Sequence, residues 1–63
     1  MHAVLFPLLN GERIGINVAE ISVICEIKRG TRIFLKNELY YDVDMKILEV
    51  FKAMHKPTSN LAE

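Results

Sequence analysis

Hydrophobic and polar residues alternate along most of the chain, and this period of two predicts β-strands. In residues 12–18 the apolar side chains occupy every second position and face one side of the predicted strand: Ile14, Ile16 and Val18. Four further segments have the composition of strands: residues 3–9, 21–27, 32–36 and 39–43. The pattern therefore predicts four or five strands, the last of them short.

Asn10-Gly11 is the strongest turn signal, because both residues accept positive φ and suit a two-residue type I′ hairpin. That loop length places Leu5 opposite Ile16, on the face of the hairpin that we expect to form the core. Pro7 has no backbone N–H, which favours an edge position for this strand. The opposite face of the strand then carries an apolar set: Val4, Phe6 and Leu8.

The hydrophobic period becomes helical after residue 43. Apolar side chains recur at helical spacing, at Ile47, Leu48, Phe51 and Met54. Asp44 is the expected N-cap, and Pro57 is expected to end the helix. We predict an α+β fold, in which an antiparallel meander sheet of four or five strands carries one C-terminal amphipathic helix. Residues 1–56 form one domain in this prediction, and residues 57–63 form a flexible tail.

The chain has more apolar residues than one face of a small sheet can bury. Hydrophobic residues make up 51% of its 63 positions, and a domain of this length leaves much of its surface in contact with water. We therefore expect a homo-oligomer that associates through an apolar sheet face. The residues assigned to this interface are Val4, Phe6, Leu8 and Ile24. The competing interpretations are that the first strand is covered on both faces within one chain, or that the helix covers this face and the rest of the core is arranged differently.

Residue types that support enzymatic chemistry are few and separated in the sequence. Cys25 is the only cysteine, which excludes an internal disulfide, and its place on the apolar phase of a strand predicts a buried thiol. His2 and His55 lie at opposite ends of the chain, which argues against a metal site. Asp42 and Asp44 could form a carboxylate pair, although a helix cap and a neighbouring turn residue account for both. We expect no enzyme, no cofactor and no metal.

Charge and hydropathy narrow the classes of partner and compartment. Eight basic and eight acidic residues give zero formal net charge, unlike a general polyanion binder. No apolar stretch reaches the roughly 20 residues of a membrane-spanning helix. Residues 3–9 lack a preceding basic segment and contain Pro7, so they predict a strand rather than a signal peptide. A free thiol without an export signal indicates the cytoplasm.

A basic segment without acidic residues, at positions 28–36, is the alternative candidate site. It predicts a hairpin on which cations and aromatic rings share one strand face, an arrangement that can neutralise phosphates and stack a base. The residues assigned to this candidate nucleic-acid-binding site are Lys28, Arg29, Arg32, Phe34, Lys36 and Tyr40. The competing interpretation is an ordinary hairpin whose charges face water.

Several short motifs follow one another in a recognisable order over residues 5–54: Leu9-Asn10-Gly11, Ile16-Asn17, Ile21, Ile33-Phe-Leu-Lys-Asn37, a tyrosine-rich strand to Val43 and the amphipathic helix. This order resembles the small FlbD/SwrD-type flagellar proteins. The chain departs from their pattern at Val18, where they tend to have proline, and at Glu38, where they tend to have glycine. The resemblance implies a small, cytoplasmic, non-enzymatic protein linked to flagellar assembly or motor performance. A phage-encoded regulatory protein is the other context that fits this size.

Overall fold

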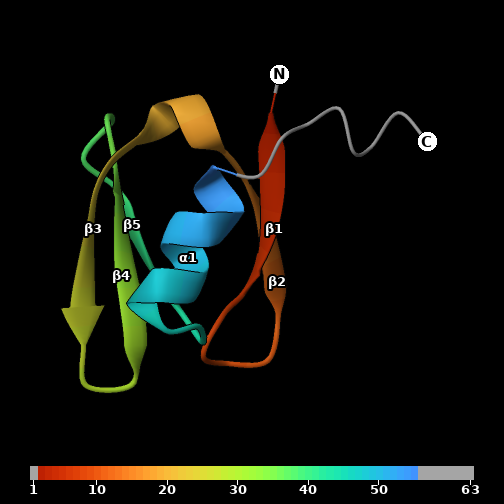
Figure 1. The fold of residues 1–63 in the computed structure, drawn as a ribbon, viewed down its shortest axis with the longest axis vertical. Coiled ribbons are helices and arrows are strands. Elements are labelled where there is room, and N and C mark those ends of the chain that lie inside the picture. Colours follow the sequence, from red (N-terminus) through yellow and green to blue (C-terminus); the bar gives the residue numbers. More distant parts are fainter. Residues whose placement is uncertain (1, 56–63) are drawn as a thin grey trace.

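The alternating segments form strands and the helical segment forms a helix, as the computed structural model shows over the described residues 2–55 (Figure 1). The elements are β1 (Ala3–Pro7), β2 (Arg13–Asn17), a 3₁₀-helix (Val18–Glu20), β3 (Ile21–Ile27), β4 (Gly30–Leu35), β5 (Tyr40–Val43) and α1 (Ile47–Met54). The protein is therefore a small α+β domain. The predicted tail at residues 57–63 lies outside the described residues.

The strands form two antiparallel sheets, so the single meander sheet expected from the sequence is not confirmed. β1 pairs with β2, and β4 lies between β3 and β5 in the other sheet. An isolated bridge between Leu8 and Val43 connects the end of β1 to the end of β5. Beside that bridge, the Asp44 N–H donates to the Pro7 carbonyl oxygen at 2.7 Å. In Figure 1 the β1–β2 hairpin and the three-stranded sheet lie on either side of α1.

The turn of the first hairpin, between the hydrogen-bonded Leu8 and Glu12, contains three residues, one more than predicted. The Leu8 N–H donates to the Glu12 carbonyl at 2.7 Å, and the Gly11 N–H donates to the Leu8 carbonyl at 3.1 Å. Gly11 has a φ of 92°, whereas Asn10 is not among the residues with positive φ. The Asn10 side chain instead accepts the Glu12 N–H through Oδ1 at 2.9 Å. This pattern matches a tight turn followed by a left-handed glycine, the usual three-residue hairpin loop.

The extra loop residue shifts the hairpin register by one, so the predicted faces of β1 are exchanged. Phe6 pairs with Ile14, and Leu5 pairs with Gly15. Phe6 is completely buried, whereas Leu5 is 67% exposed. The prediction that Val4, Phe6 and Leu8 lie on an exposed face is therefore wrong: Phe6 belongs to the core, and Val4 and Leu8 pack against it.

The core takes one side chain from each of five elements. These are Phe6 of β1, Ile16 of β2, Ile33 of β4, Val43 of β5 and Val50 of α1. β3 contributes no fully buried residue, although Ile21 and Ile24 pack partly against the core. β3 is accordingly the most exposed strand of the three-stranded sheet.

The helix begins later than predicted and turns a different side to the core. Its N-cap is Lys46 rather than Asp44, and the Thr31 hydroxyl fixes the preceding turn by donating to the Met45 carbonyl at 2.7 Å. Val50 faces the sheet, while Leu48 is 69% exposed and Phe51 is 52% exposed. The predicted apolar side of the helix is thus only partly confirmed, because an eight-residue helix covers the sheet with one narrow stripe.

Candidate interaction surface

The outer face of the three-stranded sheet carries a continuous group of side chains, which we call the aromatic face. It has two cross-strand rows, set by the pairing of β3 with β4 and of β4 with β5. One row is Val23, Phe34 and Tyr40, and the other is Cys25, Arg32 and Asp42. The alternate residues of β4, Thr31 and Ile33, are buried on the opposite side. The side chains of the two rows therefore point away from the core.

The first row of the aromatic face is an apolar strip in contact with solvent. The rings of Phe34 and Tyr40 lie with their centroids 5.7 Å apart and their planes inclined by 53°. Tyr40 is 51% exposed and Val23 is 54% exposed. Tilted aromatic pairs at this distance are favourable, so the strip is held in place by contacts within the sheet.

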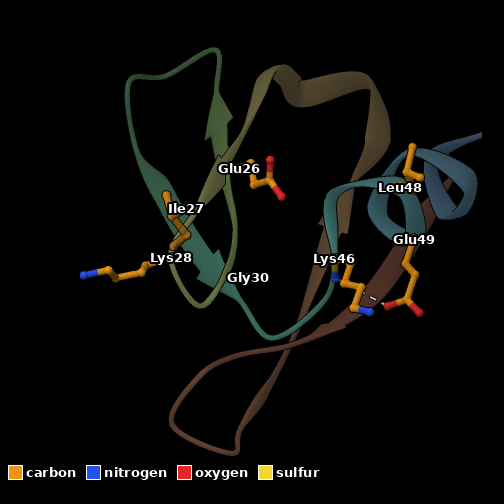
Figure 2. A pocket seen from close by; sticks show the side chains of 7 residues that line it. All are labelled: Glu26, Ile27, Lys28, Gly30, Lys46, Leu48 and Glu49. Atoms are coloured by element: carbon orange, nitrogen blue, oxygen red, sulfur yellow. Dashed lines mark hydrogen bonds between the residues drawn. The ribbon is translucent and has the colours of Figure 1, made fainter.

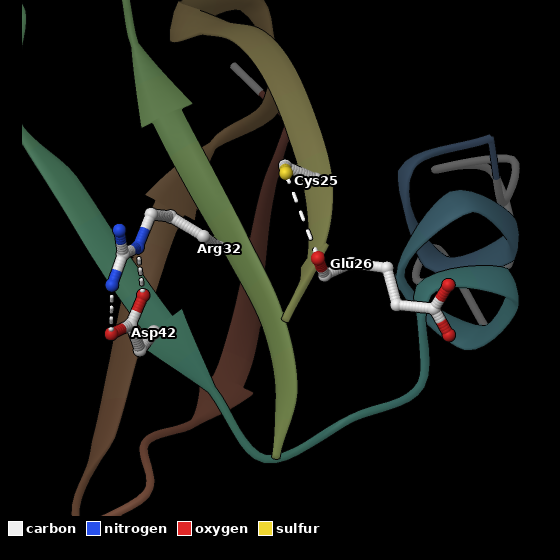
Figure 3. A network of polar contacts seen from close by, with 4 residues as sticks. All are labelled: Cys25, Glu26, Arg32 and Asp42. Atoms are coloured by element: carbon white, nitrogen blue, oxygen red, sulfur yellow. Dashed lines mark hydrogen bonds and ion pairs between the residues drawn. The ribbon is translucent and has the colours of Figure 1, made fainter. Parts of the chain in front are cut away.

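The second row contains a closed ion pair. Arg32 Nε donates to Asp42 Oδ1 at 2.7 Å, and its second guanidinium nitrogen donates to Oδ2 at 3.1 Å (Figure 3). Its Cζ atom also lies 4.4 Å from the centroid of the Tyr40 ring. The hydrogen bond from Arg32 lowers the pKa of Asp42, with burial opposing the shift, and the same bond raises the pKa of Arg32. The guanidinium charge is thus neutralised within the face.

Cys25 completes the second row at the open side of the sheet. Its thiol is exposed, and its Sγ atom lies 3.7 Å from the Glu26 carbonyl oxygen (Figure 3). The prediction of a buried thiol is wrong, because the apolar phase of β3 that packs on the core is the phase of Ile24. Cys25 lies on the phase that faces solvent.

The structure brings together half of the predicted nucleic-acid-binding set. Arg32, Phe34 and Tyr40 lie side by side on the aromatic face. The other three, Lys28, Arg29 and Lys36, are exposed in the turns that precede and follow β4. These turns lie at opposite ends of β4, so the strand separates Lys36 from Lys28 and Arg29.

The predicted apolar interface is not found on one surface. Three of its four residues belong to the first hairpin and pack in or against the core, as described above, and Ile24 is half-buried opposite Ile33. Other large apolar side chains that are exposed were not predicted as a surface: Leu5, Val23, Leu39, Leu48 and Phe51. For Leu5 the missed signal is Leu9-Asn10-Gly11 itself, which also fits a three-residue loop ending in glycine.

A shallow open hollow lies between the β3–β4 turn and the start of α1 (Figure 2). It encloses about 700 Å³ and is lined by Glu26, Ile27, Lys28, Gly30, Lys46, Leu48 and Glu49. Lys46 and Glu49 point toward each other in Figure 2, where the Lys46 backbone N–H donates to Glu49 Oε1 at 3.4 Å. The hollow contains neither histidine nor cysteine, and its charges occur in both signs.

The other candidate titratable residues make contacts that stabilise the fold. Asp42 is engaged by Arg32, so it does not form a pair with Asp44. His55 caps the C-terminal end of α1, with Nδ1 2.9 Å from the Phe51 carbonyl oxygen and its ring 4.3 Å from the Phe51 ring. Within residues 2–55, no group of three His, Cys, Asp or Glu side chains is arranged to hold a metal ion. Among the same residues, α1 is too short to cross a membrane.

Comparison of the chain with protein-family models, with curated proteins and with solved structures gave no match.

Proposed function

We propose that the protein is a non-catalytic interaction module that works as a homo-oligomer and binds a protein partner on the aromatic face. The observation that carries this proposal is an apolar strip on the outer face, Val23–Phe34–Tyr40, whose two end residues are exposed, beside a cation that Asp42 already neutralises. Apolar groups exposed together on a small domain are typical of interaction sites. Aromatic and arginine side chains are also the residue types enriched at protein interfaces.

The charge arrangement favours a protein partner over a nucleic acid. A polyanion is bound largely by cations that replace its counterions. On the aromatic face the guanidinium of Arg32 donates two hydrogen bonds to one carboxylate, so binding a phosphate there requires breaking that pair. Zero formal net charge over the whole chain gives no general attraction to compensate.

A photo-crosslinking amino acid at position 40 tests the binding face in cells that express the protein. We expect position 40 to give a discrete protein adduct, which Phe34→Ser on the same face removes. The same crosslinker at Leu5, which is at least as exposed as Tyr40 but lies on β1, is the matched control and should not give this adduct. Identical adducts at positions 40 and 5 would contradict the proposal, as would an adduct that survives Phe34→Ser.

A small nucleic-acid-binding protein is the second candidate, because two aromatic rings are available for stacking beside Arg32. Lys28, Arg29 and Lys36 would supply the phosphate contacts from the turns. Fluorescence anisotropy with single-stranded DNA and RNA probes at low salt distinguishes this candidate. Binding that weakens steeply with salt and is lost in Phe34→Ser supports it; no binding to either probe removes it.

We also propose a cytoplasmic location and a regulatory rather than enzymatic role, on the basis of the sequence. The FlbD/SwrD-type resemblance supports a flagellar context, and a phage-encoded context fits the same size. Glu38 adds one structural argument, because it adopts a φ of 74° at the position where that family tends to have glycine. Gene neighbourhood distinguishes the two contexts, since a flagellar operon is expected for the first and a prophage for the second.

A further inference from the structure

The outer edge of β3 is open to pairing. β3 has β4 on one side and no strand on the other among residues 2–55. It is seven residues long, the longest of the strands described. Natural proteins protect such edges with charged side chains, proline or bulges. The irregularity of β3 lies at its start, between Ile21 and Val23, and the stretch from Val23 to Ile27 has one charged residue, Glu26, and neither lysine nor proline.

The direction of the backbone groups on this edge follows from the bonds of β4. The Leu35 N–H donates to the Leu39 carbonyl at 2.8 Å, on the β5 side, and the Lys36 N–H donates to the Glu20 carbonyl at 2.9 Å, on the β3 side. Bonding direction alternates along an antiparallel strand. Phe34 and Arg32 therefore direct their backbone N–H and carbonyl groups to β3.

The same alternation identifies the unpaired groups of β3. Val23 is paired with Phe34, and Cys25 with Arg32, so these residues of β3 turn their backbone groups to β4. The residues between and after them, Ile24 and Glu26, then direct their N–H and carbonyl groups to the open edge. The free edge therefore offers two donors and two acceptors in regular spacing.

We propose that a second copy of this chain pairs with this edge, antiparallel, about a two-fold axis at Cys25. In this register Ile24 lies opposite Glu26 of the second copy, and Glu26 lies opposite its Ile24. All the edge groups of both copies are then paired, because each such pair exchanges two hydrogen bonds. The two three-stranded sheets become one sheet of six strands.

The limits of the regular edge select this axis over its neighbours. The β3–β4 register shifts between Ile21 and Val23, which marks a bulge at one end, and the turn at Lys28 ends the strand at the other. Cys25 is the midpoint of the regular segment between them. An axis at Ile24 would bring the bulged Ser22 opposite Glu26 and leave fewer regular pairs.

The side chains are compatible with this pairing on both faces. Glu26, the one charged residue of the segment, faces Ile24 and not a second carboxylate. Val23, which is 54% exposed in one chain, comes opposite Ile27 of the second copy on the outer face. The inference rests on the proposed function, because it names how the copies of the homo-oligomer meet, and it leaves Phe34 and Tyr40 free for the protein partner.

Glu26→Pro tests the edge, because it removes an N–H that points away from β4 and so leaves the internal ladder intact. We expect sedimentation velocity to show a dimer for the unaltered protein and a monomer for Glu26→Pro, with equal circular dichroism spectra. Glu26→Ala is the matched control, since it removes the side chain but keeps the N–H, and it should remain dimeric. Loss of the dimer in both variants would assign the effect to the carboxylate and overturn the proposed pairing.

Disulfide trapping tests the register without altering the edge. Cys25 and its symmetry mate form a pair without mutual backbone bonds, where Cα atoms lie about 4.5 Å apart, within the range of a disulfide. Diamide, which accepts the two thiol hydrogens, should therefore link the unaltered protein into covalent dimers. In the double variant Val23→Cys/Cys25→Ser the thiol stays on the same outer face but lies opposite Ile27, so linkage should be at least about tenfold slower.

Equal linkage rates for the two cysteine positions, or a purely monomeric protein that diamide does not link, would overturn the edge pairing. These outcomes are separate from the photo-crosslinking at position 40. A specific adduct at that position together with a monomer keeps the binding face and removes the edge dimer. A dimer that requires the β3 edge, without an adduct at position 40, leaves the edge pairing standing and removes the proposed binding face.

Discussion

At the scale of single residues, Arg32 shows why the aromatic face is preorganised. Its guanidinium is bound to Asp42 through two hydrogen bonds and lies over the Tyr40 ring, so a long side chain is fixed by two neighbouring contacts. The side chains of Arg32 and Asp42 remain 36% and 28% exposed. Solvent therefore screens the ion pair, which adds little to stability. The main effect of the pair is to position the guanidinium over the Tyr40 ring and to neutralise its charge.

The Asp42–Arg32 pair predicts a dependence of stability on pH. The pKa of Asp42 lies below its usual 3.8 in the folded chain, so the unfolded chain takes up a proton first as the pH falls. The contribution of the pair is fully present above the unfolded pKa of about 4 and is lost as the pH falls through the lowered folded pKa. Urea unfolding between about pH 7 and pH 2 should show a smaller acid loss for Asp42→Asn. An unchanged acid profile in that variant would contradict this assignment.

Phe6 and Leu5 are neighbours in the sequence with opposite roles, which gives a sharp test of the hairpin register. Phe6 is 0% exposed and Leu5 is 67% exposed. We expect Phe6→Ala to lower the free energy of unfolding by about 3–5 kcal/mol, enough to unfold a domain of this size. Leu5→Ala should lower it by less than about 1 kcal/mol. Urea titration of both variants measures the difference. A larger loss of unfolding free energy at Leu5 than at Phe6 would support the two-residue loop instead.

Glu38 is the one described residue other than glycine with positive φ, at 74°. A side chain in this left-handed region costs roughly 1–2 kcal/mol, a cost that glycine does not have. The greater freedom of glycine in the unfolded chain offsets part of this gain. Glu38→Gly should therefore raise the free energy of unfolding by up to about 1 kcal/mol, as thermal unfolding can measure. Lys36→Gly, in the same turn without positive φ, is the control and should be destabilising.

At the scale of elements, the second hairpin depends on its glycine more strictly than the first. Gly30 has a φ of 127°, and a β-carbon there would collide with the carbonyl oxygen of Val43, whereas one at Gly11 would meet no atom within 4 Å. Gly11→Ala should cost about 1–2 kcal/mol from backbone strain alone. Gly30→Ala should prevent β5 from pairing with β4. Two-dimensional NMR spectra should therefore show the dispersed peaks of a folded protein for Gly11→Ala and the poorly dispersed peaks of an unfolded one for Gly30→Ala. Dispersed peaks in both variants would be inconsistent with the close approach of Gly30 to the Val43 carbonyl.

The elements that were predicted well are those whose signal is local. The alternation in residues 12–18 and the helical spacing before Met54 depend on the chain's own periodicity, and both elements are present in the structure. The register of β1 was predicted wrongly, because a two-residue and a three-residue loop can use the same glycine, and the sequence does not determine the φ of Asn10 that distinguishes them. One such choice exchanges the faces of a whole strand.

The candidate site was predicted only in part, because strand alternation is a local signal and the pairing between strands is not. Arg32, Phe34 and Tyr40 could be assigned to one surface, since strand alternation and the turn after Leu35 determine their positions. The partner of Arg32 could not be assigned, because it depends on which residue of β5 lies opposite. That residue is Asp42, and its presence changes the surface from cationic to neutral.

At the scale of the whole molecule, the small size of the core is a physical reason to expect association. Five fully or nearly fully buried apolar side chains hold the described part of the fold together, and a single small core of this kind rarely supplies more than about 3–5 kcal/mol. Small domains usually gain further stability from disulfides, metals or oligomers. The single cysteine excludes an internal disulfide. Pairing of the β3 edges is therefore expected to contribute to stability as well as to assembly.

A dimer that forms only from folded chains makes stability depend on protein concentration. The midpoint of thermal unfolding should rise steadily with concentration for the unaltered protein, because mass action favours the paired state. Glu26→Pro should unfold at the same temperature at every concentration. At high dilution its unfolding midpoint should equal that of the unaltered protein. Tyr40→Ser, which alters the aromatic face but not the edge, should keep the concentration dependence. If the slope were lost in Tyr40→Ser and kept in Glu26→Pro, the copies would meet through the aromatic face, and the open edge of β3 would have another role.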